Sequence, residues 1–219
     1  MKSALKAVIF DLDGVLTDTA GYHYLAWRKV ADELGIYFDE RINERLKGVE
    51  RMRSLEIVFE RADRGFTDQE KRLWADKKNE YYKELIETMT PSKVAPGARE
   101  LLITLKEKGI KTGLASVSKN AQTVIEKLQI KEFFDYMADA TIIKQGKPDP
   151  EIFLTVADNL QVAAECCIGV EDAAAGIKAI KTAGMFAVGI GDPQVLSEAD
   201  EVIASIVGFD LQKYIEMVF

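Results

Sequence analysis

The sequence has 219 residues, of which 47% are hydrophobic and 30% charged, as is typical of a globular protein with a well-solvated surface. Asp and Glu number 36 against 29 Lys and Arg, which gives a net charge of −7 at pH 7. This acidic balance argues against a surface that binds nucleic-acid phosphates, so an anionic ligand would need a local cluster of positive groups. The length suits one α/β core plus an accessory module, at roughly 100–200 residues per domain.

Nothing in the sequence predicts export or membrane insertion. The first residues lead directly into a short apolar run without a signal-peptide hydrophobic segment, and no stretch of about 18 apolar residues occurs. The only cysteines, Cys166 and Cys167, are adjacent in an apolar segment, where neighbouring side chains point to opposite faces of a strand. We expect both to be reduced and buried, in a soluble, cytoplasmic and monomeric protein with no nucleic-acid or membrane partner.

Short apolar runs recur along most of the chain and predict β-strands. Most lack polar alternation, which indicates strands that are covered on both faces. Helical patterns lie between them; glycines such as Gly109 and Gly184 end two of these, and Asp149 with Pro150 predicts a helix start with the proline at the first helical position. This alternation predicts a parallel, Rossmann-like α/β sheet. The predicted strands are 7–10, 112–115, 136–138, 166–170, 186–190 and 202–204.

The segment from about residue 18 to residue 90 interrupts this alternation. It has apolar residues at helical spacing but no convincing strand, and Thr67 with Glu70 predicts a capping box. We therefore predict a core domain of residues 1–17 and 91–219, with a helical domain of residues 18–90 inserted after the first strand. The apolar stripes of this insertion are Tyr22, Leu25, Ala26 and Val30, then Met52, Leu55 and Phe59, then Trp74, Tyr81, Leu85 and Ile86.

Two carboxylates, Asp11 and Asp13, follow the first predicted strand directly. Strand alternation places them toward the same side, at the carboxyl edge where open parallel sheets bind ligands. Two neighbouring anions repel each other, so the pair needs a cation or a shared proton. A polar turn after a buried strand, with Gly14 serving the bend, explains the same residues equally well when they are taken alone.

Further polar residues follow other predicted strands or precede helices. Ser116 follows one strand, Glu171 and Asp172 follow another, and Lys147 lies in a Gly-Lys-Pro-Asp-Pro turn. Each has another interpretation, since Ser116 and Asp172 could cap helices and Lys147 could be a solvated charge. Together with the strand-end pair they make up what phosphoryl transfer needs, namely a carboxylate nucleophile, an acid/base, metal ligands and groups that hold phosphoryl oxygens.

The order of these motifs resembles the haloacid dehalogenase superfamily over essentially the whole chain. The resemblance implies a sheet core with an α-helical cap, and it implies that Asp11 is the nucleophile and Asp13 the general acid/base. It also implies that Ser116 and Lys147 hold the phosphoryl group. Magnesium, which suits oxygen-only ligands, would be held by Asp11, the main-chain carbonyl of Asp13, Glu171 and Asp172.

Within the superfamily the resemblance is closest to the β-phosphoglucomutases. It rests on Thr17-Asp18-Thr19 with His23 and Trp27, on residues 46–51 and on residues 115–120. It implies that Lys47, Gly48 and Arg51 contact the substrate from the cap, and that Ser116, Ser118 and Asn120 do so from the core. Val117 also belongs to this stretch, at a position where a smaller residue is expected, and its β-branched side chain could narrow the sugar site or disturb its backbone contacts.

Two residues near the start of the insertion are candidates for a hinge. The resemblance places His23, the only histidine, near Asp13, where it could position or release the acid/base as the cap closes. Thr19 could hydrogen-bond Asp13 in the open state, or could instead cap the following helix. A lone histidine can equally be a packing or surface residue.

The resemblance implies a mutase that interconverts β-D-glucose 1-phosphate and glucose 6-phosphate through an aspartyl-phosphate enzyme, with glucose 1,6-bisphosphate as intermediate and activator. A bisphosphate bound in two orientations needs a second anion site, for which Arg51 offers a planar fork. Lys47 and Arg51 are four residues apart, a spacing that also fits a solvated helix face. The alternatives are a phosphatase acting on a small sugar or polyol phosphate, and a catalytically silent sugar-phosphate-binding protein.

Overall fold

The computed structural model describes residues 4–46 and 49–217. In these residues a parallel six-stranded sheet has the order β3-β2-β1-β4-β5-β6. Every neighbouring pair of strands is parallel, and β1 pairs with both β2 and β4 at the centre. The strands are β1 Ala7–Phe10, β2 Lys111–Leu114, β3 Tyr136–Met137, β4 Cys167–Glu171, β5 Phe186–Ile190 and β6 Glu201–Ile203, each within two residues of its prediction.

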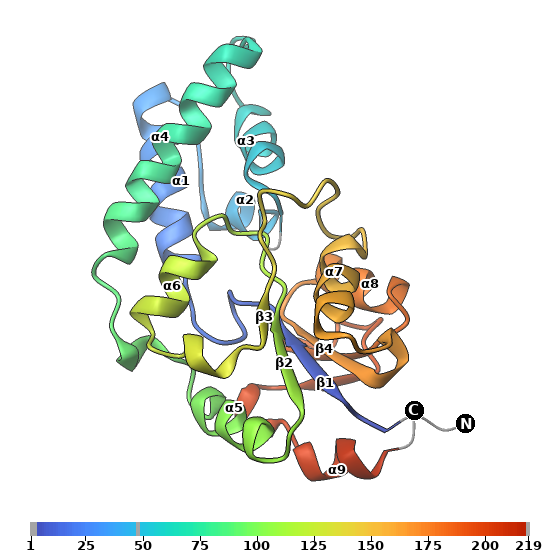
Figure 1. Ribbon diagram of the computed structural model, residues 1–219. Helices are drawn as coiled ribbons and strands as arrows, with labels where there is room; N and C mark the ends of the chain where they lie inside the picture. Colours follow the sequence, from blue (N-terminus) through green and yellow to red (C-terminus); the bar gives the residue numbers. More distant parts are fainter. Residues whose placement is uncertain (1–3, 47–48, 218–219) are drawn as a thin grey trace.

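Helices cover both faces of this sheet, as the apolar runs predict (Figure 1). On β1, Val8 and Phe10 pack into one hydrophobic cluster, whereas Ala7 and Ile9 pack into the cluster on the opposite face. The first cluster includes side chains of α5 Ala98–Glu107, α6 Ala121–Lys127 and α9 Leu211–Glu216, and the second includes those of α7 Glu151–Leu160 and α8 Ala174–Thr182. Burial on both faces explains why the strands lack polar alternation.

Helix ends follow the predicted signals with one correction. Gly109 and Gly184 adopt the left-handed conformation beyond α5 and α8, with φ of 67° and 78°. The helix α7 begins at Glu151, so Pro150 is its N-cap residue and not its first helical residue. The Asp149 carboxylate still accepts a hydrogen bond from the Glu151 backbone N–H at 2.9 Å, which moves the predicted start by one residue.

The helices α1 Ala20–Leu34, α2 Glu40–Glu44, α3 Arg51–Phe59 and α4 Asp68–Ile86 form the cap, which lies beyond the carboxyl edge of the sheet (Figure 1). Trp27, Leu55 and Ala75 belong to a hydrophobic cluster of the cap alone. The Thr67 capping box is present at the start of α4, as predicted. Leu25 differs from its prediction, because its side chain is 49% exposed and lies off the buried stripe of α1.

The two chain crossings between cap and core are joined to each other. Thr17 forms an antiparallel bridge with Val94, and the Ala95 N–H donates to the Leu16 carbonyl at 2.8 Å. The Thr17 hydroxyl also donates to the Lys93 carbonyl at 2.8 Å. The entry to the cap and the exit from it are therefore held side by side.

Cys166 and Cys167 are both buried and free, as predicted, and burial raises the pKa of the Cys167 thiol to about 12. Within the described chain we find no helix with the length and hydropathy of a membrane span.

Candidate active site

Asp11 lies directly after β1, and its carboxylate forms part of a buried ion-pair cluster. Lys147 Nζ donates to Asp11 Oδ1 at 2.6 Å and to Glu171 Oε2 at 2.7 Å. The side chains of Lys147 and Glu171 are 0% exposed and that of Asp11 is 8% exposed, so these charges are almost completely withdrawn from water. Lys147 is thus a buried partner of two carboxylates and not the solvated charge that its loop position also allowed.

Glu171 is fixed by contacts to both of its carboxylate oxygens. Oε2 accepts from Lys147, and Oε1 accepts from the backbone N–H groups of Asp172 and Ala173 at 3.1 and 3.2 Å. A Cβ on Gly176 of α8 would lie 1.9 Å from Glu171 Oε2, so only glycine leaves room for this carboxylate. Backbone and helix packing therefore set the position of Glu171 independently of any ligand.

Asp172 completes an acidic group at the end of β4. Asp11, Glu171 and Asp172 each offer one oxygen, and these oxygens lie within 4.8 Å of one another. Gly14 makes this approach possible, because it has φ of 76° and a Cβ there would lie 2.0 Å from Asp172 Oδ2. Asp172 does not cap α8, whose N-cap residue Ala173 makes no side-chain hydrogen bond.

Crowding raises the pKa of two of these carboxyl groups. Burial raises the pKa of Asp11 to about 7, with the Glu171 charge adding to the rise and Lys147 opposing it. Burial, followed by the charges of Glu171 and Asp11, raises the pKa of Asp172 to about 9. Three carboxylates face one ammonium, which leaves two negative charges uncompensated when all are ionised. Oxygen ligands with this excess charge fit a divalent cation such as Mg²⁺.

Asp13 is held from the start of the cap. Its backbone N–H donates to Asp11 Oδ2 at 3.1 Å, and its own Oδ1 accepts a hydrogen bond from the Thr19 hydroxyl. Thr19 is completely buried, and its side chain makes no capping hydrogen bond to α1. Of the two roles predicted for Thr19, the contact with Asp13 is therefore the one that the structure contains. Burial raises the pKa of Asp13, and the Thr19 hydrogen bond opposes that rise.

His23 connects Asp13 to the cap helix α4. His23 Nε2 lies 3.7 Å from Asp13 Oδ2, and Nδ1 lies 2.7 Å from Lys78 Nζ. The imidazole stacks on Tyr82 with the ring centroids 4.1 Å apart. Burial and the positive charges of Lys78 and Arg51 hold the pKa of His23 well below its usual value. The imidazole is therefore neutral, and when Lys78 donates to Nδ1 the ring proton faces Asp13 from Nε2.

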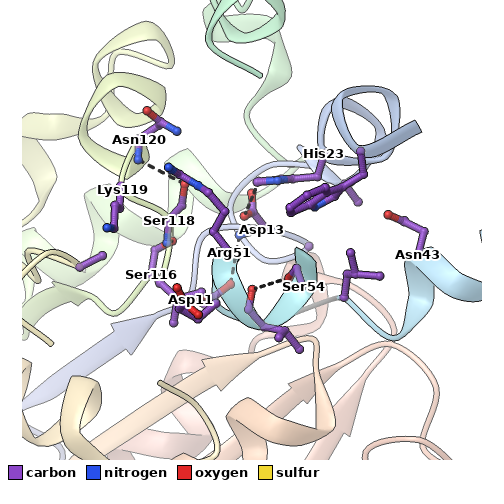
Figure 2. Close-up of a pocket in the computed structure, with 18 of the residues that line it drawn as sticks. Asp11, Asp13, His23, Asn43, Arg51, Ser54, Ser116, Ser118, Lys119 and Asn120 are labelled. Atoms are coloured by element: carbon purple, nitrogen blue, oxygen red, sulfur yellow. Dashed lines mark hydrogen bonds and ion pairs between the residues drawn. The ribbon is translucent and has the colours of Figure 1, made fainter. Parts of the chain in front are cut away.

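A cavity that is open to solvent lies between the cap and this carboxylate cluster, and the empty space in and at the mouth of it is about 1020 Å³. Figure 2 shows Arg51 reaching from α3 toward Ser118 and Asn120 of the core, with Asp11 near Ser116 and Asp13 near His23. Nine of the residues that the sequence assigned a catalytic, substrate-binding or metal-binding role line this cavity. They are Asp11, Asp13, His23, Arg51, Ser116, Val117, Ser118, Asn120 and Asp172.

The other predicted residues have different positions. Thr19 is buried against Asp13, and Lys147 and Glu171 are buried against Asp11 without lining the cavity. Lys47 and Gly48 lie outside the described residues. Ser116 Oγ accepts from the Ser118 backbone N–H at 3.2 Å, while the N-cap residue of α6 is Asn120, so Ser116 is not the helix cap that its position also allowed.

Several cavity residues were not predicted from the sequence. Lys78 is 3% exposed, and burial together with the charge of Arg51 lowers its pKa to about 7. Its Nζ lies 5.0 Å from the ring centroid of Trp27 and 4.7 Å from that of Tyr82. The sequence did contain a sign of this position, because Lys78 has the same helical spacing as the buried residues Ala75 and Tyr82. A search for apolar residues at helical spacing passes over a lysine. Asn43 and Ser54 also line the cavity, and no motif identified them.

Comparison with known proteins agrees with this geometry. The model of the haloacid dehalogenase-like hydrolases matches residues 5–184. The chain belongs to this family. Haloacid dehalogenase-like enzymes use Mg²⁺, and Asp11, Glu171 and Asp172 form a corresponding acidic group.

Individual relatives narrow the comparison within the haloacid dehalogenase-like family. A β-phosphoglucomutase of Bacillus subtilis is 49% identical over 201 residues, which cover 91% of this chain and 89% of that protein. A phosphorylated carbohydrates phosphatase of Thermotoga maritima is 33% identical over 206 residues, covering 90% of this chain and 93% of that one. The crystal structure of a β-phosphoglucomutase from Clostridium difficile superposes with a TM-score of 0.93 and is 46% identical, covering 96% of this chain and 97% of that one.

Proposed function

We propose that the protein is a phosphosugar mutase that interconverts β-D-glucose 1-phosphate and glucose 6-phosphate, with glucose 1,6-bisphosphate as intermediate and activator. The observation that carries the proposal is one cavity with a cationic group at each end. At the core end Lys147 is buried behind Asp11, and at the other end Arg51 of the cap reaches toward Asn120 of the core. A bisphosphorylated sugar needs both sites at once, in either orientation, whereas hydrolysis of one phosphoester needs only the first.

Asp11 is the proposed nucleophile. It must be ionised to attack phosphorus, and burial with neighbouring carboxylates works against ionisation by raising its pKa to about 7. Lys147, at 2.6 Å from Oδ1, opposes this rise and leaves Oδ2 free of the lysine. Mg²⁺ held by Asp11, Glu171, Asp172 and the main-chain carbonyl of Asp13 would offset the remaining repulsion and the charge on the phosphoryl oxygens. Lys147 and Ser116 would hold phosphoryl oxygens from the core.

Asp13 is the proposed general acid and base. In the first half-reaction the free sugar hydroxyl attacks phospho-Asp11, the bond between phosphorus and Asp11 breaks, and Asp13 takes the hydroxyl proton. In the second, Asp11 attacks the other phosphoryl group and Asp13 returns the proton to the departing sugar oxygen. Thr19 and His23 hold the Asp13 carboxyl through the cap, so its position depends on where the cap lies.

The cap separates transfer from hydrolysis in this scheme. Water reaching phospho-Asp11 would release inorganic phosphate, and cap closure over the sugar excludes that water. We assign residues 18–90 to the cap domain, and 1–17 with 91–219 to the core domain. We also propose that the enzyme acts as a cytoplasmic monomer, which the two free cysteines support because cytosolic thiols stay reduced. Size-exclusion chromatography of purified protein tests the monomer.

The decisive experiment supplies purified protein with Mg²⁺, β-glucose 1-phosphate and a trace of glucose 1,6-bisphosphate, and measures glucose 6-phosphate and inorganic phosphate together. We expect glucose 6-phosphate in excess, and loss of activity with EDTA that added Mg²⁺ restores. Inorganic phosphate without isomer would instead favour a sugar phosphatase. The 33% identical Thermotoga relative is a phosphorylated carbohydrates phosphatase, which makes this the main alternative. Asp11→Asn distinguishes the mutase and the phosphatase from a protein that only binds sugar phosphates. Either enzyme would lose its turnover, whereas a binding protein has no turnover and would keep most of its affinity.

A further inference from the structure

Asn79 of α4 connects the cap to the core through a single oxygen. Its Oδ1 accepts a hydrogen bond from Arg51 Nη2 at 2.8 Å and another from Asn120 Nδ2 at 2.8 Å. Arg51 is the first residue of α3 in the cap, and Asn120 is the N-cap residue of α6 in the core. One neutral acceptor therefore gathers a cation and an amide from opposite walls of the cavity.

The position of Asn79 distinguishes it from the residues that it holds. Arg51 and Asn120 line the cavity, and Asn79 is not among the lining residues, so it holds both donors from behind. Each donor keeps further N–H groups, because a guanidinium has five and a side-chain amide has two. The remaining donors of these two cavity-lining residues can bind a phosphate oxygen of a ligand in the cavity.

The neutrality of Asn79 matters for Arg51. In the described part of the chain Arg51 forms no ion pair with a carboxylate, and burial lowers its pKa although Asp76, Glu50 and Glu80 oppose this. An amide oxygen satisfies one guanidinium N–H and leaves the positive charge uncancelled for an anion. A carboxylate at the same place would fix the geometry equally well but would neutralise that charge.

We propose that Asn79 is a positioning residue that sets Arg51 and Asn120 at the spacing required by the second phosphate of the substrate, and so makes cap closure and recognition of that phosphate one event. This inference rests on the proposed function and deepens it. Asn79 touches no substrate atom in this account, and it acts through Arg51 and Asn120. Removal of the Asn79 side chain should therefore weaken ligand binding only slightly in a variant that already lacks the Arg51 side chain.

The test measures affinity for glucose 1,6-bisphosphate by calorimetry, with Mg²⁺ and in an Asp11→Asn background that cannot turn over. Asn79→Ala should weaken binding about tenfold, as expected for loss of a hydrogen bond to a charged group. In an Arg51→Ala background the same substitution should weaken binding by less than about twofold, because coupled residues are not additive. The matched control is Asn159→Ala, an exposed asparagine of α7 whose side chain donates to its own helix.

Two further variants keep the test decisive. Asn79→Ser retains a shorter acceptor and should bind with intermediate affinity, even if the alanine variant folds poorly. Asn79→Asp keeps the geometry but cancels the charge of Arg51, and should also bind the bisphosphate more weakly. The inference is overturned if Asn79→Ala binds as tightly as its parent, or if its loss is equally large with and without Arg51. Failure of the proposed function is a separate result, since a protein that forms no glucose 6-phosphate can still show the coupling in binding.

Discussion

Buried cations have different kinds of partner on the core side and on the cap side of the site. In the core, Lys147 is paired with Asp11 and Glu171 at 2.6 and 2.7 Å, so a cation and two anions hold one another. On the cap side, the two described cations that line the cavity have neutral close partners, since Arg51 bonds Asn79 and Lys78 bonds His23. Among the described residues neither cap cation forms an ion pair with a carboxylate.

This difference matches two tasks: the core side carries the phosphoryl-transfer chemistry, and the cap side recognises the second phosphate. Charges that are already paired stay in place whether or not a ligand is present, which suits a nucleophile that must keep one geometry through two half-reactions. Arg51, a cation with a neutral partner, keeps its charge available, which suits a site that must bind and release an anion. Three substitutions test the comparison, each with a neighbouring residue of the same type as its control.

Lys147→Ala should have the largest effect. It leaves Asp11 and Glu171 buried without their cation, which should lower the free energy of unfolding by about 3–5 kcal/mol. Loss of the group beside the nucleophile should lower kcat by about 100- to 1000-fold. Chemical denaturation and the isomerisation assay measure the two effects, and Lys144→Ala, three residues earlier and exposed, is the control. A folded Lys147→Ala variant with activity within tenfold of wild type would contradict a structural and catalytic role.

Arg51→Ala should impair substrate recognition more than fold stability. We expect kcat/KM for isomerisation to fall about 10- to 100-fold, which is the range for a lost charge-assisted hydrogen bond. Hydrolysis of p-nitrophenyl phosphate, which has no second phosphate, should fall much less. The control is Arg53→Ala on the same helix, whose side chain is exposed. Equal losses in both reactions would show that Arg51 does not serve a second phosphate.

Lys78→Met should change the pH dependence of stability. Burial and Arg51 lower the pKa of Lys78 to about 7, from the 10.5 of an ordinary lysine, so folding releases a proton between these values. The free energy of unfolding should therefore rise with pH by up to about 1.4 kcal/mol per unit above pH 7, and the methionine variant should lose this slope. Denaturation at pH 7 to 10 measures it, with the neighbouring Lys77→Met as control. An unchanged slope in Lys78→Met would mean that Lys78 keeps its proton in the fold.

The core side of the site could be predicted from the sequence because parallel topology makes few arrangements possible. Once the apolar runs are identified as parallel strands, the residues that follow them must meet at one edge. Asp11, Ser116 and Asp172 do line one cavity, and Glu171 and Lys147 are buried beside Asp11. The close approach of Gly176 to Glu171 could not be predicted, because it depends on how α8 packs against the sheet.

The cap was harder to predict because its buried face is not wholly apolar. The stripe expected on α4 was Trp74, Tyr81, Leu85 and Ile86, whereas the buried residues of that helix are Ala75, Lys78, Tyr82 and Ile86. A lysine in the middle of the buried face hides the true stripe, since apolar periodicity assigns lysine to solvent. Asn79 was missed for a related reason, as its role depends on contacts with α3 and α6 that no local pattern contains.

The bridge between Thr17 and Val94 has a consequence for how this architecture can be altered. Because the outgoing and returning segments touch, the chain of the cap leaves the core and returns to it at one place. Exchanging that block for one from a relative would leave the order and pairing of the six strands untouched. The graft would bring its own side chains at the positions of Arg51 and Asn79, whereas Asn120 would stay with the core, so the two parts must still match across the cavity.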